Sequence, residues 1–259
     1  MRNTYTLHTE KLFTVVILLL LAACSKDDKD NGKPADGKTC FVTKSYIDGD
    51  TSQYATKFIY NSSDLVVYVD GVGSDDYSIS YESNKITIRG VPPYTADNYT
   101  VYYLRSDSMA YASAYYLSGV QIDTTLYFYD AGKYLAKSVR YTSAFGKDSV
   151  LMTYSAGNLQ KIIIYNSNGT KPQATFEYYN DSCKSWMYQA IAPYNNNGYY
   201  YPWLGKGNKN LIKSFTTDFY STLSTVSIKY TINAKGYADD YITTSEGGSA
   251  QTYFEYKCR

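Results

Sequence analysis

The residues able to carry acid–base chemistry in this sequence are almost all carboxylates, because the chain contains a single histidine, His8. His8 precedes a long apolar run that we expect to be removed from the mature protein. The mature chain would then have no Ser-His-Asp or Cys-His pair, no HExxH zinc helix and no imidazole base. Two carboxylates about 5 to 9 Å apart, which any two strands could supply, remain a route to glycoside hydrolysis. A carboxylate-dependent hydrolase therefore stays open as an alternative function.

No group of residues has the spacing of a metal or cofactor site. Asp75-Asp76 and Asp239-Asp240 are adjacent carboxylates, and neighbours in a strand point to opposite faces. Asp48-Gly49-Asp50 and Asp70-Gly71 match only fragments of a calcium loop, and hairpin turns explain them better. No CxxC pair occurs to hold zinc. We expect neither a metal nor a cofactor.

Charge excludes one class of partner. Without residues 1–23 the chain has 23 basic and 23 acidic side chains, so its formal net charge is zero. No basic stripe interrupts this balance, whereas binding to nucleic acid depends on clustered Lys and Arg. We do not expect a nucleic-acid partner.

The N-terminal segment has the pattern of an export signal. Leu12 to Ala23 is apolar except for Thr14. As a helix this run would reach roughly 18 Å, short of the roughly 30 Å hydrocarbon core, so a cleaved signal peptide over 1–23 is favoured. It ends in Leu21-Ala22-Ala23-Cys24, which resembles the lipobox of bacterial lipoproteins. The resemblance implies cleavage between Ala23 and Cys24 and attachment to a membrane through acyl chains on Cys24.

Residues 24–38 are expected to form a flexible tether. No aliphatic side chain larger than alanine occurs from Ser25 to Lys38, and such a segment has a mean reach of about 20 Å. Ser25-Lys26-Asp27-Asp28 resembles the acidic signal that sends some lipoproteins to the outer face of the outer membrane, although a merely solvated charge run is the alternative. We expect a lipid anchor in the outer membrane, on the cell surface or on the periplasmic face.

The rest of the chain repeats a unit of two alternating strands around a short polar turn. Examples are "FIYNSSDLVVYV" from Phe58 and "SIKYTINAKGYADDYI" from Ser227. Tyrosine, with 32 copies after Cys24, favours strands and can cover a sheet. The turns Asn166–Gly169 and Asn233–Gly236 place glycine where a type I turn needs a following residue of positive φ. Tyrosines precede the turns throughout, at Tyr60, Tyr81, Tyr103, Tyr129, Tyr154 and Tyr230, and Tyr256 lies in the last strand.

This pattern predicts an all-β domain over residues 39–259, a long antiparallel meander of about sixteen strands between Cys40 and Cys258. So many strands must curl into a curved sheet or a barrel. A barrel that spans a membrane needs an unbroken apolar row facing lipid. In "YLAKSVRY" Lys137 and Arg140 interrupt both rows. A soluble curved sheet or barrel is therefore favoured.

Three cysteines remain after Cys24: Cys40, Cys183 and Cys258. Cys40 and Cys258 fall in the first and last predicted strands, where a disulfide could fasten the ends of the domain together. The alternative is that all three are small buried hydrophobic residues.

The segment 183–211 breaks the alternation, and a short helix is expected near Ser185 to Ile191. Long irregular inserts on a regular scaffold carry function or cover an open end. The aromatic residues of this insert could form a platform for a sugar ring, or they could pack as a hydrophobic lid. They are Trp186, Tyr199, Tyr200, Tyr201 and Trp203.

Three C-terminal stretches carry a family resemblance: "WLGKGNKNLIKSFT" from Trp203, "YTINAKGY" from Tyr230 and "YFEYKC" from Tyr253. They resemble a family of secreted bacterial lipoproteins of unknown function described as having a porin-like fold, and the hairpin units are similar to YD repeats. The resemblance implies a many-stranded curved sheet and carries over no catalytic residue.

Together these features favour a lipid-anchored, non-catalytic binding or scaffold domain of the cell envelope, whose ligand is a glycan or a protein. The alternatives are the carboxylate-dependent glycoside hydrolase and a purely structural envelope component.

Overall fold

The computed structural model describes residues 40–47, 55–71, 76–91, 98–143, 146–182, 202–219 and 223–258. Sixteen strands and one 3-10 helix, η1 (Pro202–Leu204), lie in these ranges. The strands are β1 (Cys40–Ile47), β2 (Ala55–Tyr60), β3 (Val66–Asp70), β4 (Tyr77–Tyr81), β5 (Lys85–Gly90), β6 (Tyr99–Leu104), β7 (Ala110–Leu117), β8 (Val120–Tyr129), β9 (Leu135–Thr142), β10 (Gly146–Ser155), β11 (Asn158–Tyr165), β12 (Gln173–Ser182), β13 (Asn210–Thr217), β14 (Ser224–Ile232), β15 (Ala238–Ser245) and β16 (Gly248–Cys258). Within the described ranges, no helix has the length and apolar character needed to cross a bilayer.

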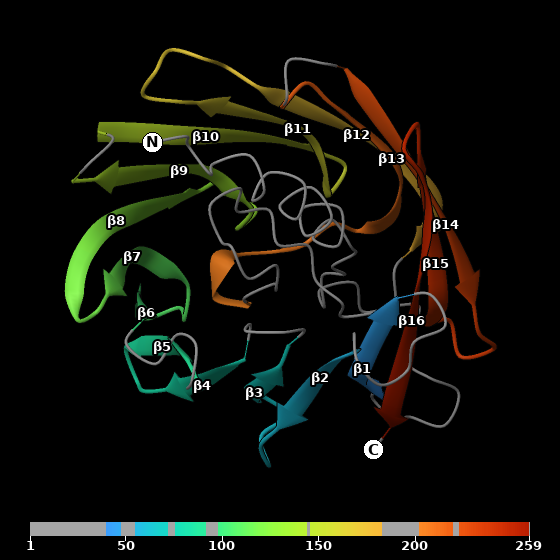
Figure 1. The fold of residues 1–259 in the computed structure, drawn as a ribbon, viewed down its shortest axis with the longest axis horizontal. Coiled ribbons are helices and arrows are strands. Elements are labelled where there is room, and N and C mark those ends of the chain that lie inside the picture. Colours follow the sequence, from blue (N-terminus) through green and yellow to red (C-terminus); the bar gives the residue numbers. More distant parts are fainter. Residues whose placement is uncertain are drawn as a thin grey trace, which may run out of the picture.

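The strands form one closed barrel, seen as a ring in Figure 1. Each strand pairs antiparallel with the next one along the chain, and β16 pairs with β1 to complete the ring. Closure gives every described strand a neighbour on both sides, which is one way for a large sheet to avoid exposed edges. The predicted meander of about sixteen strands is confirmed, and of the two predicted shapes the barrel is the one observed.

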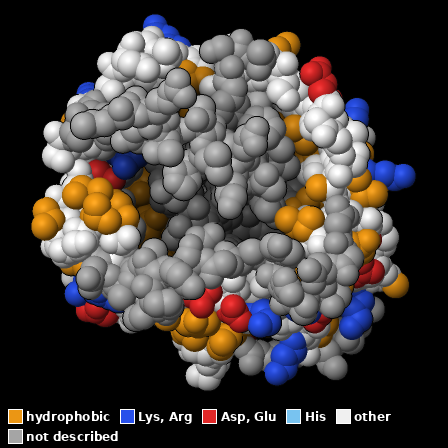
Figure 2. All heavy atoms as spheres, viewed as in Figure 1, with side chains coloured by type: hydrophobic (Ala, Val, Ile, Leu, Met, Phe, Trp, Pro, Cys, Tyr) orange, Lys and Arg blue, Asp and Glu red, His pale blue; other side chains and the backbone are white. Residues whose placement is uncertain are grey.

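Alternation along the strands places apolar side chains mainly on the inner wall and polar side chains mainly on the outer wall. In β5, Ile86 and Ile88 face inward and are each 4% exposed, whereas Lys85, Thr87 and Arg89 face outward. Figure 2 shows most of the charged side chains around the outer edge, and hydrophobic side chains on both the inner and the outer edge. Over most of the ring the outward row suits water, whereas a membrane-spanning barrel carries an apolar outward row.

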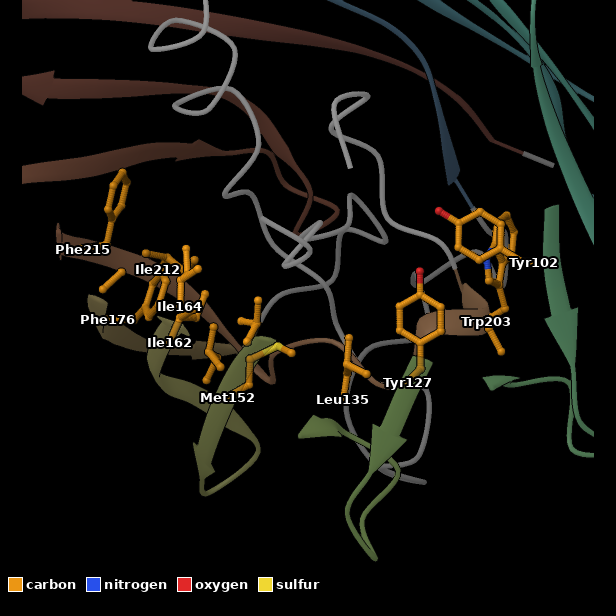
Figure 3. Packing of buried hydrophobic residues seen from close by; sticks show 14 of the residues in the cluster. Tyr102, Tyr127, Leu135, Met152, Ile162, Ile164, Phe176, Trp203, Ile212 and Phe215 are labelled. Carbon is orange, nitrogen blue, oxygen red and sulfur yellow. The ribbon is translucent and has the colours of Figure 1, made fainter. Parts of the chain in front are cut away.

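The inward side chains form one hydrophobic cluster that extends around the barrel. Ile162, Ile164 and Phe176 lie on one side of it, and Tyr102 and Trp203 lie together on the other (Figure 3). Phe176 and Phe215 face each other across β12 and β13, with ring centroids 6.2 Å apart. The core is therefore the lining of the barrel.

The two ends of the barrel differ in what they carry. We call the end where β1 begins and β16 finishes the terminal end; each even-numbered strand there connects to the next odd-numbered strand. We call the opposite end the far end. Cys40 and Cys258 lie opposite each other at the terminal end and are joined by a disulfide. Both ends of the domain are thus fixed at one end of the barrel.

One turn type recurs between strands. Its first residue accepts a hydrogen bond from the amide three residues later, and the residue at that position has positive φ. Gly236 (φ 85°) and Gly169 (φ 84°) take this position, which confirms the turns predicted from their Asn-x-x-Gly sequences. In the turn that begins at Asp130, Lys133 takes it instead (φ 66°), because Gly132 stands one residue earlier.

Tyrosine hydroxyls tie neighbouring strands together at the terminal end. Each donor lies near the end of an even-numbered strand, and each acceptor is a carbonyl near the start of the preceding strand. The bonds are Tyr60 to Val42 (2.7 Å), Tyr81 to Val66 (2.8 Å), Tyr129 to Ala110 (2.7 Å), Tyr178 to Leu159 (2.6 Å) and Tyr256 to Ala238 (2.6 Å). Four of these five tyrosines belong to the periodic series seen in the sequence, so this bond gives those four a structural role.

Candidate functional site

The chain just before β13 packs into the terminal half of the interior. Trp203, in η1, is 4% exposed. It packs against the part of the inner wall formed by β4 and β6, strands that come much earlier in the sequence (Figure 3). Its ring centroid lies 5.5 Å from that of Tyr102 and 6.0 Å from that of Tyr81. The Tyr129 hydroxyl lies 3.2 Å from the Trp203 carbonyl oxygen, which accepts a hydrogen bond from it. The indole thus belongs to the core.

Backbone hydrogen bonds hold the residues that follow Trp203 against the turns of the terminal end. The Lys206 amide donates to the Lys133 carbonyl and the Lys209 amide to the Gly157 carbonyl, each at 2.9 Å. The Asn208 side chain is fully buried, and its Oδ1 accepts the Leu159 amide at 2.7 Å. Gly205 has positive φ (98°), and a Cβ there would lie 2.6 Å from the Lys133 carbonyl oxygen. The segment therefore fits closely into this end.

The far half of the interior is polar in the sector formed by β7, β8 and β9. We call this set of inward-facing residues the polar sector: Ser113, Tyr115, Asp123, Thr125, Ser138 and Arg140. Ser113 is opposite Thr125 in the ladder, Thr125 is opposite Arg140, and Tyr115 is opposite Asp123. Four members are 5–9% exposed, namely Ser113, Asp123, Thr125 and Ser138.

An ion pair lies at the centre of the polar sector. Asp123 Oδ2 accepts hydrogen bonds from Arg140 Nη2 at 2.7 Å and from Arg140 Nε at 3.1 Å. The Asp123 side chain is 8% exposed and that of Arg140 is 27% exposed. A buried charge requires such a partner, because an unpaired one is costly to remove from water. The Arg140 side chain thus remains partly exposed while its charge is balanced.

Two tyrosines beside the ion pair respond to its field. Burial raises the pKa of Tyr127 to about 12, opposed by a hydrogen bond with Ser113 and reinforced by the negative charge of Asp123. Burial also raises the pKa of Tyr115, again with a contribution from Asp123. Both phenols therefore stay neutral donors at ordinary pH, and Tyr127 shares a 2.8 Å hydrogen bond with Ser113.

The polar sector can recognise a ligand through hydrogen bonds. Its hydroxyl groups donate and accept, and the guanidinium has five N–H donors in a planar arrangement. Two inward-facing carboxylates lie in or beside the polar sector, and both accept hydrogen bonds. Asp123 accepts from Arg140, and Asp148 accepts from the Ser167 amide at 2.7 Å. Among the described residues, no group of three His, Cys, Asp or Glu side chains could hold a metal ion.

The residues proposed from the sequence are distributed unevenly. Trp203 packs in the core, as the lid alternative requires for this residue, whereas Trp186 and Tyr199 to Tyr201 lie outside the described residues. Ala23 and Cys24 also lie outside them, as does the helix expected near Ser185 to Ile191. Cys40 and Cys258 form the terminal disulfide. The insert, predicted over 183–211, overlaps the start of β13 at Asn210.

The polar sector was not among the residues predicted from the sequence. The available signal was the strand alternation, which places Arg140 and Lys137 on opposite faces of β9. Once Tyr127 is known to face inward, alternation also turns Asp123 and Thr125 inward. The pairing register that brings Asp123 beside Arg140 could not be read from the sequence.

Comparison with known proteins shows the fold. No family model matches the chain, and no curated protein matches it. Two crystal structures described as porin-like proteins are similar to it. One, from Bacteroides uniformis, has a TM-score of 0.64 and 14% sequence identity, covering 83% of this chain and 96% of the other. The second, from Bacteroides vulgatus, has a TM-score of 0.62 and 13% identity, covering 85% and 99%. The porin-like fold implied by the C-terminal stretches is thereby confirmed.

Proposed function

We propose that this chain is a lipid-anchored, non-catalytic binding protein of the bacterial envelope that receives its ligand at the far end of the barrel. The observation that carries the proposal is the opposition of the two ends. Both ends of the domain and the Trp203 segment occupy the terminal end, whereas the Asp123–Arg140 pair faces the far half of the interior.

The anchor gives this opposition a direction. Cys24 precedes Cys40 by a short stretch, and Cys40 is fixed at the terminal end by its disulfide. Acyl chains on Cys24 would therefore hold the terminal end next to the membrane and leave the far end pointing away from it. An outer-membrane location, on the cell surface or the periplasmic face, fits both this geometry and the lipobox.

The chemistry of the polar sector favours a ligand rich in hydrogen-bonding groups. A glycan or an extended protein segment offers hydroxyl or carbonyl oxygens to Arg140 and to the hydroxyls of Ser113 and Thr125. The porin-like fold of the two similar structures is compatible with a binding protein or with a structural component of the envelope. We favour binding, because a structural role does not require a charged pair inside the barrel.

The anchor is tested by mass spectrometry and fractionation. We expect the mature protein to begin at Cys24, to carry the mass of its acyl chains and to sediment with the outer membrane. Cys24→Ala should release the protein into the soluble fraction, because it removes the thiol that carries the lipid and with it the acyl methylenes, each of which contributes about 0.8 kcal/mol of membrane affinity. A mature chain that begins elsewhere, or carries no acyl mass, would refute the proposal.

The binding site is tested with a double variant in which both members of the ion pair are replaced by neutral residues. Asp123→Asn combined with Arg140→Gln removes both charges together, which avoids leaving one buried charge unpaired. Retention of the protein on neutral polysaccharides in affinity electrophoresis should fall about tenfold, equivalent to about 1.4 kcal/mol of binding free energy. Lys229→Gln, on the outer wall of β14, is the control and should bind as the wild type does. Equal retention of the pair variant, or turnover of a polysaccharide by the wild type, would overturn the assignment.

A further inference from the structure

The outer wall of β8 to β11 differs from the rest of the ring. It exposes three large apolar side chains, Phe128 (47%), Tyr141 (45%) and Leu151 (37%). Register places Lys137 between Phe128 and Leu151, and it places Lys147 beside Tyr141. We call this surface the basic wall: Phe128, Tyr141, Leu151, Lys137, Lys147 and Lys161, together with Lys171 just beyond β11.

The lysines of the basic wall have no carboxylate partner among the described residues. Three of them lie over aromatic rings: Lys137 over Phe128 (5.9 Å to the centroid), Lys147 over Tyr141 (5.7 Å) and Lys171 over Tyr165 (5.5 Å). Three lysines elsewhere on the outer wall lie beside acids: Lys44 with Glu255 at 3.3 Å, Lys57 with Asp70 at 2.8 Å and Lys85 with Glu82 at 3.2 Å. The basic wall is thus an uncompensated positive surface on a chain of nearly balanced charge.

The carboxylates nearest in sequence cannot neutralise it. Between residues 120 and 165 the chain has three acidic side chains, Asp123, Asp130 and Asp148. Asp123 and Asp148 face the interior, and Asp130 caps the turn between β8 and β9 by accepting the Tyr134 amide. The field outside these strands is therefore positive, which attracts an anionic partner.

The arrangement of the surface favours a sugar chain over a lipid surface. Polar residues flank the apolar side chain in the outward row of β10, where Lys147, Ser149, Leu151 and Thr153 follow one another. Contact with hydrocarbon would desolvate the hydroxyls and ammonium groups between the apolar side chains. A chain of sugars crossing strands about 4.8 Å apart can instead meet an ammonium, a hydroxyl and an aromatic ring in succession.

We propose that the basic wall binds a polyanionic polysaccharide, a sugar chain bearing carboxylate or sulfate groups. The site is independent of the polar sector, because it lies on the opposite face of the same strands. A variant that loses one site should keep the other. The ligand class follows from the unpaired lysines, and the aromatic side chains add contact area for the sugar rings.

The test uses two variants of equal charge. The first variant changes four lysines of the basic wall to Gln: Lys137, Lys147, Lys161 and Lys171. The second changes four lysines elsewhere on the outer wall to Gln: Lys57, Lys85, Lys213 and Lys229. We expect the first to bind polygalacturonate or heparin about tenfold more weakly than the wild type, equivalent to about 1.4 kcal/mol, and the second to bind within about twofold. Raising the salt from about 0.05 to 0.3 M should weaken wild-type binding, because these charges are exposed to solvent.

Three outcomes would overturn the proposal. Equal losses in both variants would show that net charge alone drives binding. Equal binding of neutral dextran would remove the role of the lysines. Binding to phosphatidylglycerol vesicles, lost in the first variant, without binding to either polysaccharide would assign the surface to an anionic membrane. Asp123→Asn with Arg140→Gln should bind polygalacturonate as the wild type does, which separates this result from the far-end site.

Discussion

The terminal end and the far end of the barrel are built from the same strands but stabilised by different interactions. At the terminal end the contacts are covalent, apolar or backbone-directed: the Cys40–Cys258 disulfide, the packing of Trp203 against Tyr102, and tyrosine hydroxyls on carbonyls. In the far half the interior contains charge, with Asp123 and Arg140 paired inside the wall. One end of the barrel therefore provides stability and the other carries the groups able to recognise a ligand.

This division explains how a barrel can tolerate a buried charge pair. Buried ion pairs contribute little net stability, because desolvation offsets their attraction. Here the strands that carry the pair are already fixed at their terminal ends, where the Tyr129 hydroxyl bonds β8 to the start of β7 and to the Trp203 segment. The pair can thus be retained for recognition without determining whether the barrel closes.

The largest expected effect comes from opening the terminal disulfide. It joins residues 218 apart, and loop-closure entropy assigns a cross-link of that span a stabilisation of about 5 kcal/mol. Replacing Cys40 and Cys258 by Ser should lower the midpoint of urea unfolding strongly, because β1 and β16 would then close the ring through hydrogen bonds and packing alone. The measurement is equilibrium urea unfolding followed by tryptophan fluorescence.

Two controls define that experiment. Cys183→Ser removes the remaining cysteine of the domain and should leave the midpoint unchanged. Reduction of the wild type should reproduce the effect of the double variant. If the oxidised wild type and the double variant unfold at the same denaturant concentration, the terminal end is not the stabilising end of the barrel.

Much of the terminal end could be predicted from the sequence. The strand count, the hairpin rhythm and the Asn233–Gly236 turn at this end follow from alternation and from the few residues that accept positive φ, as at Gly236. The tyrosines that precede the turns were visible as a periodic series. Their hydroxyl bonds were not, because the partner carbonyl of Tyr129 lies 19 residues away and is set by register.

The second prediction concerns Trp203, which packs against Tyr81 and Tyr102 in the terminal half. Trp203→Ala removes a side chain that is 4% exposed and leaves a cavity between Tyr81 and Tyr102, so we expect a loss of about 4 kcal/mol in the free energy of unfolding. Asp123→Asn with Arg140→Gln, in the far half, should change it by about 1 kcal/mol or less, since both charges leave together. Calorimetric melting of both variants gives the comparison, and equal losses would contradict the assignment of stability to the terminal end.

The polar sector in the far half could not be predicted from the sequence. Alternation gives the face of each residue on its own strand, but only pairing brings Asp123 and Arg140 within 2.7 Å. The same limit applied to Trp203, for which a ligand platform and a core position were both compatible with an aromatic insert. Burial against residues from β4 and β6, far earlier in the chain, distinguishes the two, and no local pattern encodes that contact.

The smallest effect is expected from a single hydroxyl at each end. Tyr129→Phe removes the hydroxyl that bonds the Ala110 carbonyl (2.7 Å) and the Trp203 carbonyl (3.2 Å) in a partly buried site, so the free energy of unfolding should fall by about 1.5 kcal/mol. Tyr116→Phe, near the far end, removes an exposed 3.3 Å bond to Gln121 and should cost about 0.5 kcal/mol or less, because water replaces the lost partner. Urea unfolding of the two variants resolves this difference. A larger loss from Tyr116→Phe would mean that the hydroxyls at the terminal end fasten the strands no more firmly than those on the outer wall.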